Sequence, residues 1–122
     1  MTRRDRQAEA LAKGLPWEVT KAFDQSAPIG PLSRVEDVGH VRDAAIRLTV
    51  NGAVRQDSNV ALMIWNTREI IARISEQHRL EPGDLIMTGT PSGVGAVVTG
   101  DVIECSVEGL APLRVTIGAR AA

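Results

Sequence analysis

The chain has 122 residues, which suits one domain, and 43% of them are hydrophobic, which is enough for a core. Aromatic residues make up only 2%, and 14 Lys and Arg nearly balance 15 Asp and Glu, giving a net charge of −1. Without an excess of positive charge or aromatic side chains on which bases could stack, the chain is not expected to bind nucleic acid.

The sequence carries no signal for a membrane or for an oxidising compartment. No apolar run approaches the ~20 residues of a membrane span. The opening segment MTRRDRQAEALAKG has charges of both signs and lacks the apolar region of a signal peptide. The single cysteine, Cys105, excludes an internal disulfide and a cysteine-based zinc site. We therefore expect a cytoplasmic protein with no membrane partner.

The first predicted element is a helix over residues 2–13. Thr2 is its candidate cap, with Asp5 three residues later, and Gly14 followed by a proline would end it. The helix would carry an apolar stripe formed by Ala8, Leu11 and Ala12.

A β-hairpin is predicted in the middle of the chain, after an ambiguous segment at 16–23 and a Pro- and Gly-containing loop at 24–39. Residues 44–50 alternate apolar and polar side chains, which indicates a half-buried strand. Asn51-Gly52 then favours a tight turn, because both residue types accept positive φ, and 53–57 would form the return strand.

The sequence pattern of the second half of the chain predicts one helix and three strands. Asn66 is a good N-cap with Glu69 three residues on, so a helix is expected over 66–76. Because the strands occur in hairpins rather than in βαβ units, we expect an α+β, β-rich fold with mixed or antiparallel pairing and two short helices. The remaining strands are expected at 85–89, 101–109 and 112–118, with Gly109 in the turn between the last two.

The loop MTGTPSGVG, residues 87–95, is poor in side chains and rich in exposed backbone. No Lys follows its second glycine, so it is not a phosphate-binding P-loop, and its Gly-x-Gly is too short for a dinucleotide fingerprint. Two interpretations stay open. The loop is either a tight turn between strands or a wall for a ligand, with the Thr90 hydroxyl beside backbone N–H groups.

Other polar residues give weaker signals. Arg4 and Gln7 share a helix face because they are three residues apart, although a solvated surface also explains them. Lys21 lies among apolar residues, which favours a partly buried stem with an anion as partner, although a lone lysine is more often a surface residue. His40 and His78 have no metal-binding spacing and are expected at the surface, and the acidic residues form no D-x-D or E-x-E cluster.

Considered together, six ordered blocks resemble the fumarylacetoacetate hydrolase family, and most closely its small acylpyruvate-hydrolase branch. They cover nearly the whole chain, and PGDLIMTGTPSGVG is the most specific of the motifs. The blocks are TRRDRQ (2–7), GLPWEVTKAFDQSAPIGP (14–31), LTVNGAVRQD (48–57), MIWNTREIIARIS (63–75), LEPGDLIMTGTPSGVG (80–95) and GDVIECSVEGLAPLRVTI (100–117).

The resemblance implies a β-sandwich or roll of the fumarylacetoacetase C-terminal type, in an enzyme that cleaves a carbon–carbon bond in a β-diketo acid. It implies a divalent cation, usually Mg²⁺ and otherwise Mn²⁺ or Ca²⁺, that chelates the keto-enol oxygens as Lewis acid and template. It also implies a His–Glu pair that activates water, and a homodimer. Decarboxylase and isomerase relatives in aromatic-acid breakdown are the alternative activities.

By motif position, the resemblance assigns roles to four residues of this chain. Arg4 and Gln7 would contact the substrate, a small keto acid, and Thr90 would hydrogen-bond it. Lys21 would be the catalytic lysine near the metal, placed where negative charge develops. Asp5 and Arg55 are expected to be structural.

One departure from the family pattern is large. The E-x-E pair and the further Asp that bind the metal, and the His–Glu pair, would all precede Met1, so no metal ligand is expected in this chain. Residues 1–122 are therefore expected to form a single, incomplete, N-terminally truncated catalytic domain. Three possibilities follow: part of an enzyme, a marginally stable inactive fragment that associates through helix 66–76, or an unrelated binding module.

Overall fold

A computed structural model describes residues 1–119, whose strands form one antiparallel sheet in the order β2-β1-β3-β4. All three strand pairs are antiparallel, which confirms the expected β-rich α+β class and its antiparallel pairing. The strands are β1 (Ala45–Val50), β2 (Ala53–Asn59), β3 (Val102–Val107) and β4 (Leu113–Thr116).

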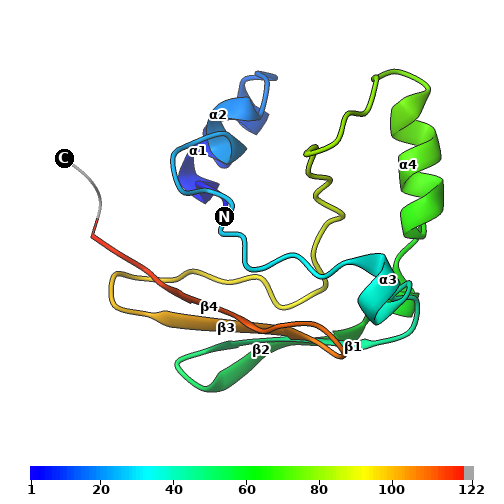
Figure 1. Cartoon of the computed structure of the whole chain (residues 1–122). Helices are drawn as coiled ribbons and strands as arrows, with labels where there is room; N and C mark the ends of the chain where they lie inside the picture. The colour runs from blue at the N-terminus through cyan, green and yellow to red at the C-terminus, as the bar shows by residue number, and fades with distance from the viewer. Residues whose placement is uncertain (120–122) are drawn as a thin grey trace.

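The two longer helices lie on one side of the sheet and stand away from it (Figure 1). Within residues 1–119, α1 packs against α2 and each strand packs against its neighbours, but no helix makes a comparable contact with the sheet. Two of the helices are single turns that the sequence did not predict. The helices are α1 (Arg4–Ala12), α2 (Glu18–Lys21), α3 (Val35–Val38) and α4 (Thr67–Ser75), with a 3₁₀ turn, η1 (Val60–Leu62), after β2.

The turn between β1 and β2 forms as predicted. Asn51 has φ 51° and Gly52 has φ 79°, so both occupy the left-handed region that a two-residue hairpin turn requires. The strand pairing shifts by one residue between Leu48 and Thr49, which marks a bulge. The Asn-Gly dipeptide therefore determines where the chain reverses.

The same turn is fastened to the start of β3. The Asn51 side chain donates to Asp101 Oδ1 at 2.8 Å and accepts from the Val102 N–H at 2.9 Å. The backbone N–H of Asn51 donates to the Val102 carbonyl at 2.8 Å. The hydrogen bond from the Val98 N–H and that from Asn51 lower the pKa of the Asp101 carboxyl. We call this set of contacts the Asn51 clasp.

The sheet has one polar and one apolar face, as the alternation predicts. On the polar face, Arg47 pairs with Asp57 at 2.7 Å and Arg114 with Glu104 at 3.2 Å. The apolar face carries Leu48, Cys105 and Leu113, which pair directly across the three strands. Burial raises the pKa of the Cys105 thiol.

The chain leaves much of its apolar surface uncovered. The chain exposes 9712 Å² of surface, whereas a compact monomer of this mass exposes about 6,400 Å². Large apolar side chains stand in solvent, including Ile64 at 97% and Leu62 at 76% exposure. Within residues 1–119 the buried residues are few, namely Ala10, Thr20, Ala44, Val50, Gln56 and Ile103, and of these only Thr20 is fully buried.

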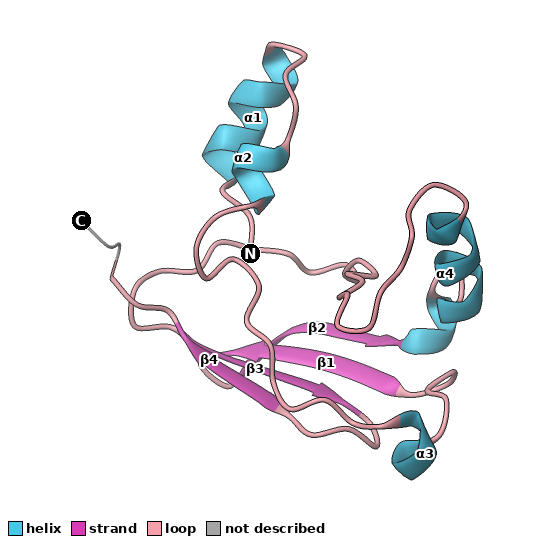
Figure 2. Ribbon diagram, turned by 45° about the horizontal axis from the view of Figure 1, so that its top comes forward, coloured by secondary structure: helices cyan, strands magenta, loops and turns pink. Residues whose placement is uncertain are grey.

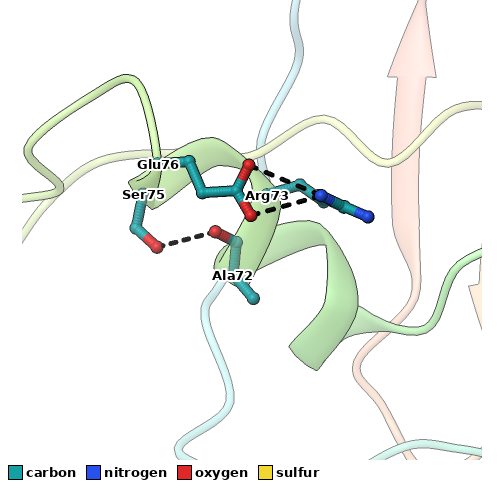
Figure 3. Close-up of polar contacts among 4 residues, drawn as sticks. All are labelled: Ala72, Arg73, Ser75 and Glu76. Carbon is teal, nitrogen blue, oxygen red and sulfur yellow. Dashed lines mark hydrogen bonds and ion pairs between the residues drawn. The ribbon is translucent and has the colours of Figure 1, made fainter.

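Helix α4 begins with the predicted capping box. The Asn66 side chain accepts from the N–H groups of Arg68 and Glu69, and Glu69 accepts from the Asn66 N–H at 2.8 Å. At its other end, Figure 3 shows Arg73 paired with Glu76 and the Ser75 hydroxyl donating to the Ala72 carbonyl. The helix is thus stabilised by its own polar contacts, independently of the sheet.

Three local predictions are wrong. Residues 85–89 are not a strand, because the described chain brings no second strand alongside them. Thr2 does not cap α1, since the N-cap position falls on Arg3 and no side chain caps it. The expected apolar stripe on α1 is also solvent-facing, with Leu11 64% exposed, while Ala10 is the residue that is buried.

Candidate functional site

The N-terminal helices form a self-contained α1–α2 unit, defined here as residues 2–23. Thr20 lies at its centre, fully buried, with its hydroxyl donating to the Trp17 carbonyl at 2.7 Å. The Arg3 N–H donates to the Thr20 carbonyl at 3.0 Å, and the Arg3 guanidinium lies 4.3 Å from the centre of the Phe23 ring. These contacts hold the end of α2 against the start of α1.

Three of the four candidate site residues lie on this unit. Arg4 Nη1 donates to Gln7 Oε1 at 2.7 Å, so the two side chains do share a helix face. Lys21 Nζ donates to the Thr2 hydroxyl at 2.8 Å. The Lys21 side chain is exposed, which agrees with the surface interpretation and not with a partly buried stem.

Thr90, the fourth residue, is held by the sheet. Gln56 on β2 is 7% exposed, and its Nε2 donates to Thr90 Oγ1 at 2.9 Å and to the Pro91 carbonyl at 2.8 Å. Gly93 has φ 99°, and a Cβ there would lie 1.9 Å from the Arg55 carbonyl oxygen. The 87–95 loop is therefore not a turn between two strands. Its glycine permits direct contact with the β2 backbone.

The structure brings Arg4, Gln7 and Lys21 onto one unit and Thr90 onto the sheet. The α1–α2 unit and the chain between α4 and β3 lie on the same side of the sheet (Figure 2). Among residues 1–119, no hydrogen bond joins Thr90 to any of the other three.

Two cavities are formed elsewhere. One, of about 460 Å³, lies beside the end of α4 and includes His78, Asp84 and Met87. The other, of about 330 Å³, lies beside the start of α4 and includes His40 and Arg42. Both histidines are exposed, as predicted. Neither cavity includes Arg4, Gln7, Lys21 or Thr90.

The described side chains do not fit a metal centre. Within residues 1–119, no three His, Cys, Asp or Glu side chains come close enough together to hold an ion. No helix in that range is long and apolar enough to cross a membrane.

Gln56 is the residue that the sequence analysis missed. It pairs with Leu48 and so occupies an inward position of β2, on the apolar face of the sheet. A polar residue at an apolar position of the alternation was the available signal, because a buried amide needs hydrogen-bond partners.

An antiparallel sheet with this set of motif blocks defines a domain of the fumarylacetoacetase C-terminal type. The family model described as fumarylacetoacetate (FAA) hydrolase C-terminal matches residues 1–118, so the chain belongs to the fumarylacetoacetate hydrolase family. An unrelated binding module is thereby excluded.

Similar proteins carry several activities. A fumarylpyruvate hydrolase of a Ralstonia species is 49% identical over 118 residues, covering 97% of this chain and 61% of that protein. The mitochondrial oxaloacetate tautomerase of Rattus norvegicus is 41% identical over 114 residues, covering 93% and 52%. The chain thus spans about half the length of the curated relatives that it matches.

A solved structure supports the same family and fold. The fumarylpyruvate hydrolase of Pseudomonas aeruginosa, in complex with Mn²⁺ and pyruvate, superposes with a TM-score of 0.95 at 48% identity. The superposition covers 98% of this chain and 52% of that one.

Proposed function

We propose that this chain is the C-terminal portion of a metal-dependent hydrolase that cleaves a carbon–carbon bond in acylpyruvate- or fumarylpyruvate-type β-diketo acids. The observation that carries the proposal is the joining of α1 to α2, in which Lys21 donates to Thr2 and Arg4 donates to Gln7 on the same α1–α2 unit. Two cationic side chains and one amide are then presented together on one small unit, which is what a dianionic keto acid requires.

Each of these residues has a distinct role in the proposal. Arg4 uses one N–H group on Gln7, and its remaining donors are free to bind the substrate carboxylate in a forked geometry. Lys21 stabilises the enolate oxygen that develops as the carbon–carbon bond breaks, and this makes it the catalytic residue. Thr90 supplies a hydroxyl to the bound substrate from the 87–95 loop.

The metal is proposed to bind outside this chain. The Mn²⁺ complex of the Pseudomonas protein supports a divalent cation, whether Mg²⁺, Mn²⁺ or Ca²⁺, as the cofactor. Because the described residues offer no group of ligands, its carboxylates would come from other polypeptide. The roles proposed for Arg4, Lys21 and Thr90 are contacts with the substrate and not with the metal ion.

Two alternatives remain. The tautomerase among the relatives favours an isomerase or decarboxylase reaction, which would use the same enolate stabilisation without adding water to a carbonyl. The large exposed surface favours a catalytically inactive chain that acts only in association. In either case we expect a cytoplasmic homodimer, whose interface would cover the apolar side chains near α4.

An assay with two forms of the protein tests the proposal. The 122-residue chain and a form extended with the in-frame sequence upstream of Met1 are each given acetylpyruvate with Mg²⁺ or Mn²⁺. Cleavage by the extended form only is the expected result. Cleavage by the shorter chain would contradict the placement of the metal ligands, and tautomerisation without cleavage would favour the isomerase. If neither form acts on the keto acid, the enzyme proposal is wrong.

A matched pair of lysine variants tests the site. In the extended form, Lys21→Met should lower kcat/KM on the order of 100-fold, because it removes the charge proposed to stabilise the enolate. Lys13→Met is the control, since Lys13 is exposed on the same unit and pairs with Glu9 at 2.8 Å. Equal activities of the two variants would show that Lys21 has no role in the reaction.

A further inference from the structure

The orientation of the Gln56 amide is fixed by its neighbours. Its Nε2 lies 2.8 Å from the Pro91 carbonyl oxygen, which can only accept a hydrogen bond. The nitrogen, not the oxygen, must therefore face the 87–95 loop. Since Gln56 is 7% exposed and lies on a strand, the amide has little freedom to turn away.

That orientation dictates what Thr90 does. The second amide hydrogen of Gln56 points to Thr90 Oγ1 at 2.9 Å, and an amide nitrogen cannot accept a hydrogen bond. The Thr90 oxygen is therefore the acceptor in this pair. Its own hydrogen is directed elsewhere, and the exposed position of Thr90 leaves it free for a ligand.

We propose that Gln56 is a positioning residue that makes Thr90 a hydrogen-bond donor toward a negatively charged oxygen of the substrate. This inference rests on the proposed function, which gives the substrate a carboxylate and an enolate oxygen. Both have only lone pairs to offer, and a hydroxyl that accepts from Gln56 keeps its own hydrogen available to donate to them. A hydroxyl free to rotate would instead lose part of its interaction to solvent.

The binding site thereby gains a hydrogen-bond donor for a substrate oxygen, in addition to the charges of Arg4 and Lys21. The buried Gln56 amide under the loop orients that donor. Gly93 contributes by keeping the loop against β2, because a side chain there would collide with the Arg55 carbonyl.

The test uses the upstream-extended form and a double-mutant cycle. Gln56→Met, which keeps the length but removes both donors, should lower kcat/KM for acetylpyruvate about tenfold, and Thr90→Val at least as much. If Gln56 acts through the Thr90 hydroxyl, the double variant should be no worse than Thr90→Val alone. A purely structural role for Gln56 would give additive losses, which would overturn the inference.

Two further measurements separate positioning from folding. Gln56→Glu places an acceptor against Thr90 at neutral pH and should lose more activity than Gln56→Met. It should recover relative to wild type as pH falls through the pKa of the introduced carboxyl, which burial raises above the ordinary glutamate value of about 4.3, because the protonated side chain can donate again. A flat pH profile would contradict the inference. Gln77→Met, at an exposed position, is the control and should match wild type.

A binding readout keeps this inference distinct from the proposed function. If the wild-type extended form cleaves no keto acid, the proposed function fails by itself. Pyruvate binding is then compared by NMR titration among wild type, Gln56→Met and Thr90→Val. Tighter binding by wild type than by either variant supports the donor role, and equal titrations overturn it.

Discussion

The sheet and the α1–α2 unit are built on different principles. The sheet is joined by contacts between distant parts of the chain, such as the Asn51 clasp, and contains Val50, Gln56 and Ile103, all buried. The α1–α2 unit is held by local contacts around one buried threonine, and most of its apolar side chains are exposed. It nevertheless carries three of the four proposed site residues.

Stability and the proposed chemistry are therefore assigned to two different regions. Substitutions in the sheet should lower the free energy of unfolding, whereas substitutions of the proposed site residues on α1 and α2 should affect activity and leave stability nearly unchanged. The 87–95 loop is the exception, because it belongs to the proposed site but depends on β2 for its position.

The largest effect is expected where the loop contacts the sheet. Gly93→Ala should lower the free energy of unfolding by roughly 2–4 kcal/mol, because its Cβ would lie 1.9 Å from the Arg55 carbonyl oxygen at a φ of 99°. Gly95→Ala is the matched control, with no atom within 4 Å of its Cβ, and should change stability by less than about 0.5 kcal/mol. Urea unfolding measures both. Equal values would mean that the loop is not anchored at Gly93.

The next largest effect is expected at the Asn51 clasp. Asn51→Gly retains the left-handed turn but removes two side-chain hydrogen bonds to the start of β3, and should cost about 1–2 kcal/mol of unfolding free energy. The loss should be seen as faster amide exchange at Val102. Unchanged exchange there would show that the β1–β3 pairing does not need the clasp.

Acid should weaken the same clasp. Because hydrogen bonds hold the pKa of Asp101 below its ordinary value of 3.8, its contribution to stability is present above that pH and is lost as pH falls through the lower folded-state value. Wild type should therefore lose stability below about pH 3.8 more steeply than Asp101→Asn. Thermal melts across this range measure the difference. Parallel curves would contradict the role of Asp101.

The smallest effect on stability is expected on the helical unit. Lys21→Met removes one exposed hydrogen bond to Thr2 and should change the unfolding free energy by less than about 0.5 kcal/mol, despite the large loss of activity proposed above. Chemical denaturation of wild type and variant checks this. A loss of several kcal/mol of unfolding free energy in Lys21→Met would show that the α1–α2 unit, like the sheet, depends on this residue for stability.

Local signals predicted the sheet well and the surroundings of the site poorly. The Asn51-Gly52 turn and the Asn66 capping box depend on residues close in sequence, so their geometry follows from local chemistry. Residues 85–89 have the composition of a strand, but a strand also requires a partner, which local patterns do not reveal. The joining of Lys21 to Thr2 and of Gln56 to Thr90 likewise arises only when the chain folds.

The order of the strands has a consequence for synthesis on the ribosome. β1 lies between β2 and β3 in the sheet. β2 follows β1 directly in the sequence, whereas Asp101, just before β3, is 50 residues downstream of its partner Asn51. At about 5–20 residues per second, the nascent hairpin waits some 3–10 s with the inner edge of β1 unpaired. A pause in translation within that interval would prolong the exposure of a bare strand edge, and the yield of folded protein should fall with its length.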